Sequence, residues 1–536
     1  MRIAHSPTLV RLSVRRGPPA SGRRMVLALL LAALVAAPTL GLGPLRPGEA
    51  GAANNSSTSG SWSYPNADLA NNRDAIGSGI TSANVSTLKK AWSFTLKGPA
   101  ATSVSGAGTV AAGPIVVNGV VYIQDLHSNV YALSLATGKL EWQYIVNKKE
   151  LSGPGPNGVA LANGMVYAAS PTTVFALNAK SGHVIWMDKD LLKKGQGTFG
   201  IQPQAANGRL YLASQYGIAS GGGILLALDA MNGHRLWSFK TVRKMSTGVT
   251  SLGLGAGGAW ETPLVSSDGS VTYGTGNPYQ SIGSALSTPG KLLYTDSVVK
   301  LDAATGKLRW YYQGVANDFK DYDMQASPIS AIANGVPVVL GGGKMGVVYE
   351  MNAATGTLLW KTPVGTHNGH DDDSLKALEH QSTLKLPYNF VPGALGGILT
   401  NMALAGNTVY VVTINFPFRF KNDGQVDGLN VNDKVAGDVE ALNLLTGKVE
   451  WSTAVDDLPL GAATVSNNLV FTTLVKGQMI ALDRTTGKIV YTTRLPGATN
   501  APIAIAGNTI IVPDGGPVAK KDKSLSQIVA YRLAPN

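Results

Sequence analysis

The chain has 536 residues and a formal net charge of +12, with 64 glycines, 28 prolines and no cysteine. The absence of cysteine excludes disulfides, thiolate metal sites and haem attachment through a C-x-x-C-H motif. The positive charge does not indicate a nucleic-acid partner, because the basic residues are scattered through turns and are not clustered with aromatic residues.

Residues 1–52 differ in composition from the rest of the chain. Arg23-Arg24 precede an apolar run from Val26 to Ala37, and Ala50-Gly51-Ala52 is typical of a signal-peptide cleavage site. We expect an export signal peptide over 1–52, a disordered polar leader over 53–60, and an extracellular, cell-envelope or periplasmic protein. The alternative is a membrane anchor, but the apolar run is short for a spanning helix of about 20 residues, so we expect no permanent membrane span.

A ten-residue phrase recurs along the remaining chain and is clearest from Leu301 to Trp310 (LDAATGKLRW). Its Asp-x-x-Thr-Gly centre predicts a hairpin turn, its flanks predict strands, and its Trp predicts a packing anchor. The turn glycines are Gly138, Gly182, Gly233, Gly306, Gly356, Gly447 and Gly487, and the anchors are Trp142, Trp186, Trp237, Trp310, Trp360, Trp451 and Tyr491. The shortest spacing, about 40 residues, is the length of a four-stranded propeller blade.

Tight two-residue turns give an independent count of the blades. They lie at Asn118-Gly119, Asn163-Gly164, Asn207-Gly208, Asp268-Gly269, Asn334-Gly335, Gly406-Asn407, Asn467-Asn468 and Gly507-Asn508. These eight turns match the seven Thr-Gly turns if the strand around Trp92 supplies the missing fourth strand of the last unit. The sequence therefore predicts an all-β fold over 61–536, a single eight-bladed propeller of four-stranded antiparallel blades. An N-terminal strand closes it by completing the C-terminal blade.

The long insertions leave the predicted blades on one face only. The connections between blades are long at 188–203, 241–259, 311–327 and 361–400, and those between second and third strands are long at 276–296 and 414–435. Because the strands of a blade alternate in direction, all six insertions lie opposite the short turns. We call this the loop-rich face and expect any site to lie there.

The sequence resembles the pyrroloquinoline quinone (PQQ) dehydrogenases, the quinoprotein alcohol dehydrogenase family of eight-bladed propellers. The repeated phrase resembles the family's blade repeat, the segment from Trp62 to Trp92 its N-terminal segment, and the stretch from Gly257 to Pro278 its cofactor floor and calcium loop. The resemblance implies an enzyme that oxidises an alcohol or another small hydroxyl substrate with PQQ and a divalent cation such as Ca²⁺. It also implies an external electron acceptor.

Three residues match the family's cofactor contacts. The resemblance places Trp260 under the flat quinone, makes the amide of Asn277 a calcium ligand, and sets Lys344 beside the quinone oxygens. Each residue type also has a structural explanation. Trp260 could be a core side chain, Asn277 a turn residue before proline, and Lys344 a solvated loop lysine.

The segment from Asn317 to Asp323 (NDFKDYD) resembles the family loop His-Asp-x-Trp-Asp-Tyr-Asp, with the His and the Trp replaced. Its Asp318 and Asp321 are our candidate catalytic residues, because positioned carboxylates support proton transfer. The alternative is that they cap a turn.

The sequence also departs from the family. Lys291 stands where the family has its catalytic Asp, and we place it with the residues that contact the cofactor; Asp296 is a possible substitute base. No carboxylate appears near Gln215 to Ala219, where the family has a calcium-binding Glu. An alternative is therefore a cofactor-free propeller that binds a polymer, a glycan or a protein at the same face.

One acidic loop has no counterpart in the resemblance. His367, His370 and the run Asp371-Asp372-Asp373 lie within seven residues, and His380 follows shortly after. These residues could bind a divalent cation through mixed oxygen and nitrogen ligands, or they could form a solvated loop.

Overall fold

The computed structural model of the chain describes residues 60–96, 109–146, 156–193, 196–215, 222–242, 256–280, 282–287, 292–373, 385–422, 425–427, 435–514 and 526–534. The expected signal peptide and nearly all of the expected leader lie outside these ranges. None of the helices within them has the length and apolar character needed to cross a membrane. The described residues all belong to one compact unit, Ala52–Asn536.

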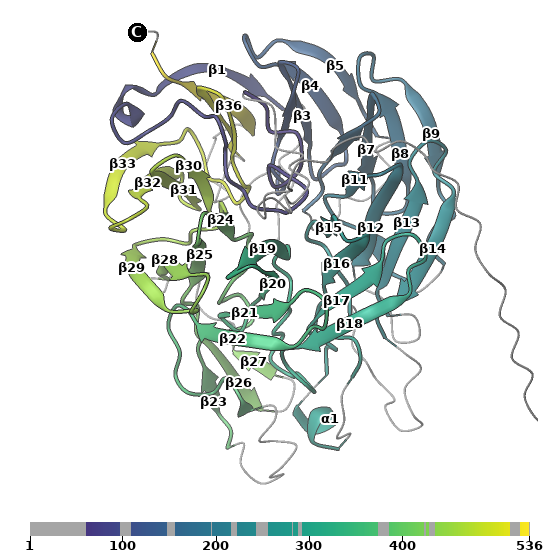
Figure 1. Cartoon of the computed structure of the whole chain (residues 1–536), viewed down its shortest axis with the longest axis vertical. Coiled ribbons are helices and arrows are strands. Elements are labelled where there is room, and N and C mark those ends of the chain that lie inside the picture. Colours follow the sequence, from purple (N-terminus) through teal and green to yellow (C-terminus); the bar gives the residue numbers. More distant parts are fainter. Residues whose placement is uncertain are drawn as a thin grey trace, which may run out of the picture. The chain divides into compact units, whose positions relative to one another are not determined.

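Eight four-stranded antiparallel sheets follow one another along the chain (Figure 1). Blade 1 consists of β2 (Ile115–Val117), β3 (Val120–Gln124), β4 (Val130–Ser134) and β5 (Leu140–Tyr144). Blade 2 consists of β6 (Ala160–Ala162), β7 (Met165–Ala169), β8 (Val174–Asn178) and β9 (Val184–Asp188). Blade 3 consists of β11 (Gln204–Ala206), β12 (Arg209–Gln215), β13 (Ile224–Asp229) and β14 (Arg235–Lys240). A short strand, β10 (Thr198–Phe199), pairs in addition with β12.

Blade 4 consists of β15 (Leu264–Ser266), β16 (Ser270–Gly274), β17 (Ser297–Asp302) and β18 (Leu308–Gln313). Blade 5 consists of β19 (Ile329–Ala333), β20 (Val336–Gly342), β21 (Val347–Asn352) and β22 (Leu358–Pro363). Blade 6 consists of β24 (Ala403–Ala405), β25 (Thr408–Ile414), β28 (Gly437–Asn443) and β29 (Val449–Val455). Blade 7 consists of β30 (Thr464–Ser466), β31 (Leu469–Leu474), β32 (Gln478–Asp483) and β33 (Ile489–Arg494). Blade 8 consists of β34 (Ala504–Ala506), β35 (Thr509–Asp514), β36 (Gln527–Arg532) and β1 (Lys89–Thr95). The predicted fold class and blade count are confirmed.

The closure of the ring is also as predicted. β1 pairs antiparallel with β36, with Trp92 opposite Ala530. The innermost strands of blades 1 and 8, β2 and β34, contact each other. The last blade is therefore completed by the N-terminal strand, which joins the two ends of the propeller by hydrogen bonds and not only by side-chain packing.

Burial within a blade follows the position of the strand. The second and third strands are buried on both faces, as in β7 and β12, because each blade is covered by its two neighbours. The outermost strands alternate between exposed and partly buried residues, as in β29. The apolar core therefore lies between adjacent blades.

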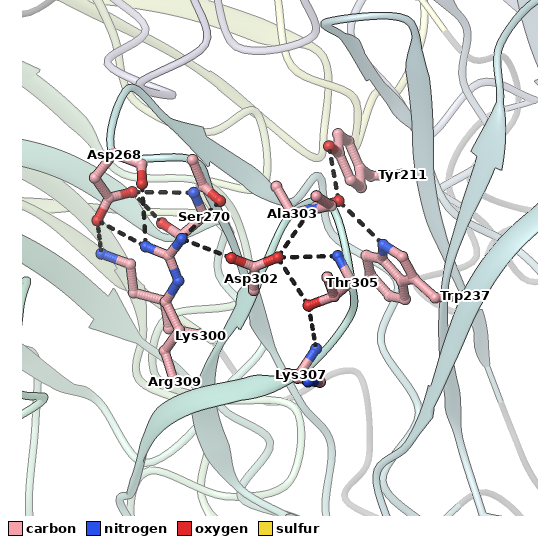
Figure 2. A network of polar contacts seen from close by, with 12 residues as sticks. Tyr211, Trp237, Asp268, Ser270, Lys300, Asp302, Ala303, Thr305, Lys307 and Arg309 are labelled. Atoms are coloured by element: carbon pink, nitrogen blue, oxygen red, sulfur yellow. Dashed lines mark hydrogen bonds and ion pairs between the residues drawn. The ribbon is translucent and has the colours of Figure 1, made fainter.

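The repeated phrase forms the turn that we expected, and Figure 2 shows one copy. Asp302 Oδ1 accepts hydrogen bonds from Thr305 N at 2.9 Å and from Thr305 Oγ1 at 2.8 Å. Gly306 follows with a φ of +68°, a conformation that favours glycine. Arg309 Nη2 donates to Asp302 Oδ2 at 2.9 Å, which ties the following strand to the turn.

The tryptophan of each phrase packs on the turn of the next blade. Trp237 Nε1 donates to Ala303 O at 3.0 Å, and its ring covers Gly306 so closely that a Cβ there would come within 2.6 Å of the ring. The same pairing joins Trp92 to Gly138, Trp142 to Gly182, Trp186 to Gly233, Trp310 to Gly356, Trp360 to Gly447 and Trp451 to Gly487. The phrase thus links adjacent blades.

The connections on the loop-rich face carry the remaining elements. The connection between β16 and β17 contains α1 (Ile282–Ser287). The short 3₁₀ helix Val85–Thr87, which precedes β1, lies on the opposite face, where Ser82 N donates to Asn468 Oδ1 in a two-residue turn at 3.0 Å. An auxiliary three-stranded sheet consists of β23 (Tyr388–Phe390), β26 (Phe418–Asn422) and β27 (Gln425–Asp427). Figure 1 shows α1 and this sheet beyond β18 and β22, outside the ring of blades.

The N-terminal segment before β1 ties the inner strands together. Arg73 is fully buried, and its guanidinium donates to Ala463 O at 2.7 Å and to Ile503 O at 2.9 Å. Asn71 Nδ2 donates to Pro328 O at 2.9 Å, beside blade 5. The buried polar residues of this segment are therefore fastened to blades on several sides of the propeller.

Candidate active site

The site residues expected from the sequence meet on the loop-rich face of blades 4 and 5. Trp260 lies in the connection from β14 to β15, and Asn277 follows β16. Asp318 and Asp321 lie between β18 and β19, and Lys344 lies in the turn between β20 and β21. Four different parts of the sequence thus converge, because the blades place all these connections at the same end.

Trp260 is not one of the inter-blade anchors. Its side chain is half-buried, and its ring lies beside Gly276, where an added Cβ would come within 3.0 Å of the ring and 2.8 Å of Asp323 Oδ1. Only glycine fits at this position without displacing one of these neighbours. An indole partly open to solvent is a surface on which a flat conjugated ring can stack.

Asn277 is held by its backbone and leaves its side-chain oxygen unused. Its N–H donates to Asp323 Oδ1 at 2.7 Å, and the residue is 2% exposed. Asn277 Oδ1 is buried and accepts no hydrogen bond. Because a buried polar atom normally has a partner, this oxygen is a candidate ligand for a cation.

Lys344 joins two carboxylates. Its Nζ lies 2.8 Å from Asp321 Oδ2 and 2.5 Å from Asp323 Oδ2, and the residue is buried. Burial opposes its charge, but the two carboxylates raise the pKa of Lys344 above its usual value. The alternative of a solvated loop lysine is therefore wrong. Asp323, which the sequence did not single out, is the shared neighbour of Lys344 and Asn277.

The two candidate catalytic carboxylates differ in their surroundings. Asp318 is fully buried, and its oxygens accept hydrogen bonds from Lys320 N at 2.8 Å and from Tyr322 N at 2.7 Å. Burial raises the pKa of Asp318 to about 6. This geometry favours the turn-capping role that the sequence left open for Asp318.

Asp321 is the more accessible of the two. Its side chain is 29% exposed, one oxygen faces Lys344, and Oδ1 accepts no hydrogen bond. Burial raises the pKa of Asp321 well above that of an ordinary carboxyl, and Lys344 only partly offsets this. Asp321 therefore has an unpaired oxygen, which a proton acceptor requires; this oxygen is itself buried, and the solvent exposure belongs to the rest of the side chain.

Asp296 is a fully buried carboxyl at the same site. Neither of its oxygens has a hydrogen-bond partner of good geometry, although an interaction with the Thr295 side chain partly offsets the rise of its pKa. Its N–H donates to Gly276 O at 3.0 Å, next to Asn277. Burial, followed by the charges of Asp318 and Asp323, raises the pKa of Asp296 well above its usual value.

Lys320 is a buried residue that the sequence reasoning missed. Its Nζ lies between 5.1 and 5.7 Å from the ring centres of Phe319, Tyr322, Tyr388 and Phe390, and it donates to His370 O. Burial lowers the pKa of Lys320 to about 8. The available signal was a lysine between aromatic residues in an acidic loop, where an ammonium group can lie against aromatic faces.

The histidine loop forms two separate His–Asp pairs. His367 Nδ1 lies 2.7 Å from Asp371 Oδ1, and His370 Nδ1 lies 2.6 Å from Asp373 Oδ2. Asp373 Oδ2 also accepts a hydrogen bond from Tyr388 Oη at 2.6 Å. Among the described residues, no three His, Asp or Glu side chains form a cluster that could hold a metal ion. The geometry thus favours hydrogen-bonded pairs over the cation site that the sequence allowed in this loop.

Three of the expected features cannot be placed. Lys291, His380 and the segment 216–219 lie outside the described residues. The structure therefore gives no position for the lysine that replaces the family's catalytic Asp.

Two family models match the chain. The model described as glucose/ethanol/alcohol dehydrogenase, beta-propeller domain, matches residues 62–161 and 210–368. The model described as outer membrane protein assembly factor BamB matches residues 145–272 and 435–530. Together they extend over most of the propeller.

Curated relatives and solved structures agree with these matches. The dehydrogenase subunit of alcohol dehydrogenase (quinone) from Gluconobacter oxydans is 26% identical, over 79% of this chain and 66% of that protein. The quinohemoprotein alcohol dehydrogenase of Comamonas testosteroni is 26% identical over 80% of this chain and 68% of that enzyme. The crystal structure of the Comamonas enzyme superposes with a TM-score of 0.76 at 21% identity, over 90% of this chain and 82% of that one. About a third of each relative lies outside the sequence match.

Proposed function

Since the chain belongs to the quinoprotein alcohol dehydrogenase-like family of PQQ-type β-propellers, we propose that it is an exported dehydrogenase that oxidises an alcohol or a similar hydroxyl substrate. PQQ and a divalent cation serve as cofactors, and an external acceptor takes up the electrons. The observation that carries the proposal is the convergence of Trp260, Asn277 and the Lys344–Asp321 pair on one face.

The types of side chain at the site are suited to binding both PQQ and a divalent cation. The half-buried indole of Trp260 offers a stacking surface for a flat quinone, and Lys344 supplies a fixed ammonium group beside it. The unpaired oxygen of Asn277 suits a hard cation, which prefers oxygen ligands. When bound over Trp260, PQQ would supply a hydride acceptor, and a cation held by Asn277 would supply Lewis-acid activation.

The protein's own contribution to the chemistry is to take up the hydroxyl proton. We assign this role to Asp321, because its Oδ1 has no hydrogen-bond partner while its Oδ2 is paired with Lys344. Lys344, held by both Asp321 and Asp323, fixes the orientation of the acceptor. Asp318 holds the backbone of the same loop through its two hydrogen bonds.

A titration of the purified mature protein with PQQ in the presence of Ca²⁺ tests the proposal. We expect a saturable change in quinone absorbance, quenching of tryptophan fluorescence, and alcohol oxidation with an artificial electron acceptor. A Trp260→Ala variant should lose the binding signal, whereas Trp186→Phe, a change at an inter-blade anchor, should keep it.

Failure to bind PQQ under these conditions would favour the second candidate function, a cofactor-free propeller that binds a polymer, a glycan or a protein. Its supporting observation is that Lys344 is neutralised by Asp321 and Asp323. A neutralised lysine attracts an anionic cofactor less strongly.

A further inference from the structure

Two neighbouring side chains of the site have buried oxygen atoms without partners. Asp296 is 0% exposed and Asn277 is 2% exposed. Both oxygens of Asp296 and the Oδ1 of Asn277 accept no hydrogen bond. By contrast, Asp318 accepts two backbone hydrogen bonds. Asp321 Oδ1 also lacks a partner, but among the described buried carboxyl groups Asp296 is the one with both oxygens unpaired.

The backbone places the two residues side by side and holds Asp296 in a fixed orientation. Asp296 N donates to Gly276 O at 3.0 Å, and Gly314 N donates to Asp296 O at 2.9 Å. Asp296 has a φ of +49°, a conformation that residues other than glycine rarely adopt and that persists where the surrounding structure enforces it. Both of its backbone polar groups are used, so only its carboxyl is left to bind something else.

The charges around these oxygens are unbalanced. Asp296, Asp318, Asp321 and Asp323 contribute four carboxyl groups that influence one another. The basic groups paired with them or beside them are Lys344 and Lys320. Lys320 also faces Asp371, Asp372 and Asp373, so the carboxyl groups around the site outnumber the ammonium groups, and a bound cation would reduce the excess of negative charge.

We propose that Asp296 and Asn277 are side-chain ligands of the cation at this site, with Asp296 supplying the carboxylate that this chain lacks near Gln215, where the family has its calcium-binding Glu. A carboxylate and an amide oxygen are donors that Ca²⁺ prefers, and water or bound substrate completes its coordination. The inference takes from the proposed function only its cation, so binding of Ca²⁺ can be tested without PQQ or substrate.

The test is calorimetric titration of the EDTA-treated full chain with Ca²⁺, supported by Tb³⁺ luminescence. We expect the unaltered chain to bind one Ca²⁺. Asp296→Asn should weaken binding by about 100-fold, because it removes a charged ligand. Asp268→Asn makes the same charge change on the opposite face and should leave the affinity unchanged. The melting temperature of the metal-free Asp296→Asn variant should be equal or higher, while its stabilisation by Ca²⁺ should disappear.

A second variant tests the inference if Asp296→Asn does not fold. Asn277→Asp keeps an oxygen ligand and adds a charge, and it should tighten Ca²⁺ binding by about tenfold. The inference is overturned if the unaltered chain binds no Ca²⁺, if Asp296→Asn binds it normally, or if Asn277→Asp binds it no more tightly. Ca²⁺ binding through Asp296 without any PQQ binding would refute the proposed function and leave this inference intact.

Discussion

At the scale of single residues, two carboxylates in one short loop have different tasks because they have different neighbours. Asp318 is enclosed and accepts two backbone N–H groups, whereas Asp321 keeps one oxygen free and is partly exposed. In the sequence the two residues cannot be distinguished, because both are aspartates of one acidic segment. Their separation into a turn cap and a candidate proton acceptor depends on which side of the loop each one faces.

This difference predicts opposite effects of two matched substitutions. Asp321→Asn should lower kcat by about 10²–10⁴-fold and leave the melting temperature nearly unchanged, because it removes a proton acceptor. Asp318→Asn should instead lower the melting temperature, because the amide replaces an acceptor of two backbone hydrogen bonds. Steady-state kinetics and thermal unfolding of both variants provide the measurement.

The pH profile gives a further check on the same residue. Only the deprotonated form of Asp321 accepts a proton, and burial raises its pKa. The rise in kcat with pH should therefore occur above the usual range of a carboxyl and should be absent in Asp321→Asn. A profile that is identical in the variant would exclude Asp321 as the acceptor.

At the scale of the elements, the repeated turn serves two blades at once. Its Asp and Thr fix the hairpin of one blade, and its glycine receives the tryptophan of the preceding blade. The spacing of the repeat is therefore set by contact between blades as well as by the geometry of the turn. A glycine is required at this position for two reasons, its positive φ and the ring above it.

A comparison of two glycines with similar backbone conformations distinguishes the effect of the positive φ from the effect of the ring contact. Gly119 has a φ of +77° with no atom near the position of an added Cβ, whereas Gly306 has a φ of +68° and lies under Trp237. Gly119→Ala should destabilise the fold by about 1–2 kcal/mol through the backbone alone. Gly306→Ala should cost a further ~1–3 kcal/mol, because it overpacks the contact with Trp237.

Thermal or urea unfolding of the two variants, followed by circular dichroism, measures the difference. Equal shifts of the midpoint would mean that the contact with Trp237 contributes little. A larger shift for Gly119→Ala would contradict this account of the turn.

At the scale of the whole propeller, the junction of the N-terminal and C-terminal strands is built like every other boundary between blades. Trp92 and Trp142 are both 8% exposed, and their Nε1 atoms donate to Leu135 O and Ala179 O at 2.9 Å in each case. Trp92 lies on β1, the strand that completes the last blade. Trp142 lies on β5, in a blade whose four strands follow one another in the sequence.

Trp92→Ala and Trp142→Ala should therefore destabilise the propeller by similar amounts, about 3–5 kcal/mol each. Urea unfolding of the two variants, followed by circular dichroism, tests this. A Trp92→Ala variant as stable as the unaltered chain would show that the junction does not hold the ring closed.

The architecture follows from the amino-acid sequence, because the repeated Asp-x-x-Thr-Gly phrase and the two-residue turns are local signals that act within about ten residues. The count of blades, the closing strand and the loop-rich face follow from these signals and are confirmed. The sequence also singled out most of the residues that meet at the site, from their resemblance to a family of known chemistry.

How those residues are used depends on contacts that form in the folded protein. The pairing of Lys344 with Asp321 and Asp323, the aromatic surroundings of Lys320, and the unpaired oxygens of Asp296 and Asn277 join segments 20 to 70 residues apart. These contacts arise where connections of different strands and blades meet, and no local pattern specifies the distance or burial of groups brought together in this way. The charge and hydrogen-bonding state of each group depends on that environment, and so does its chemistry.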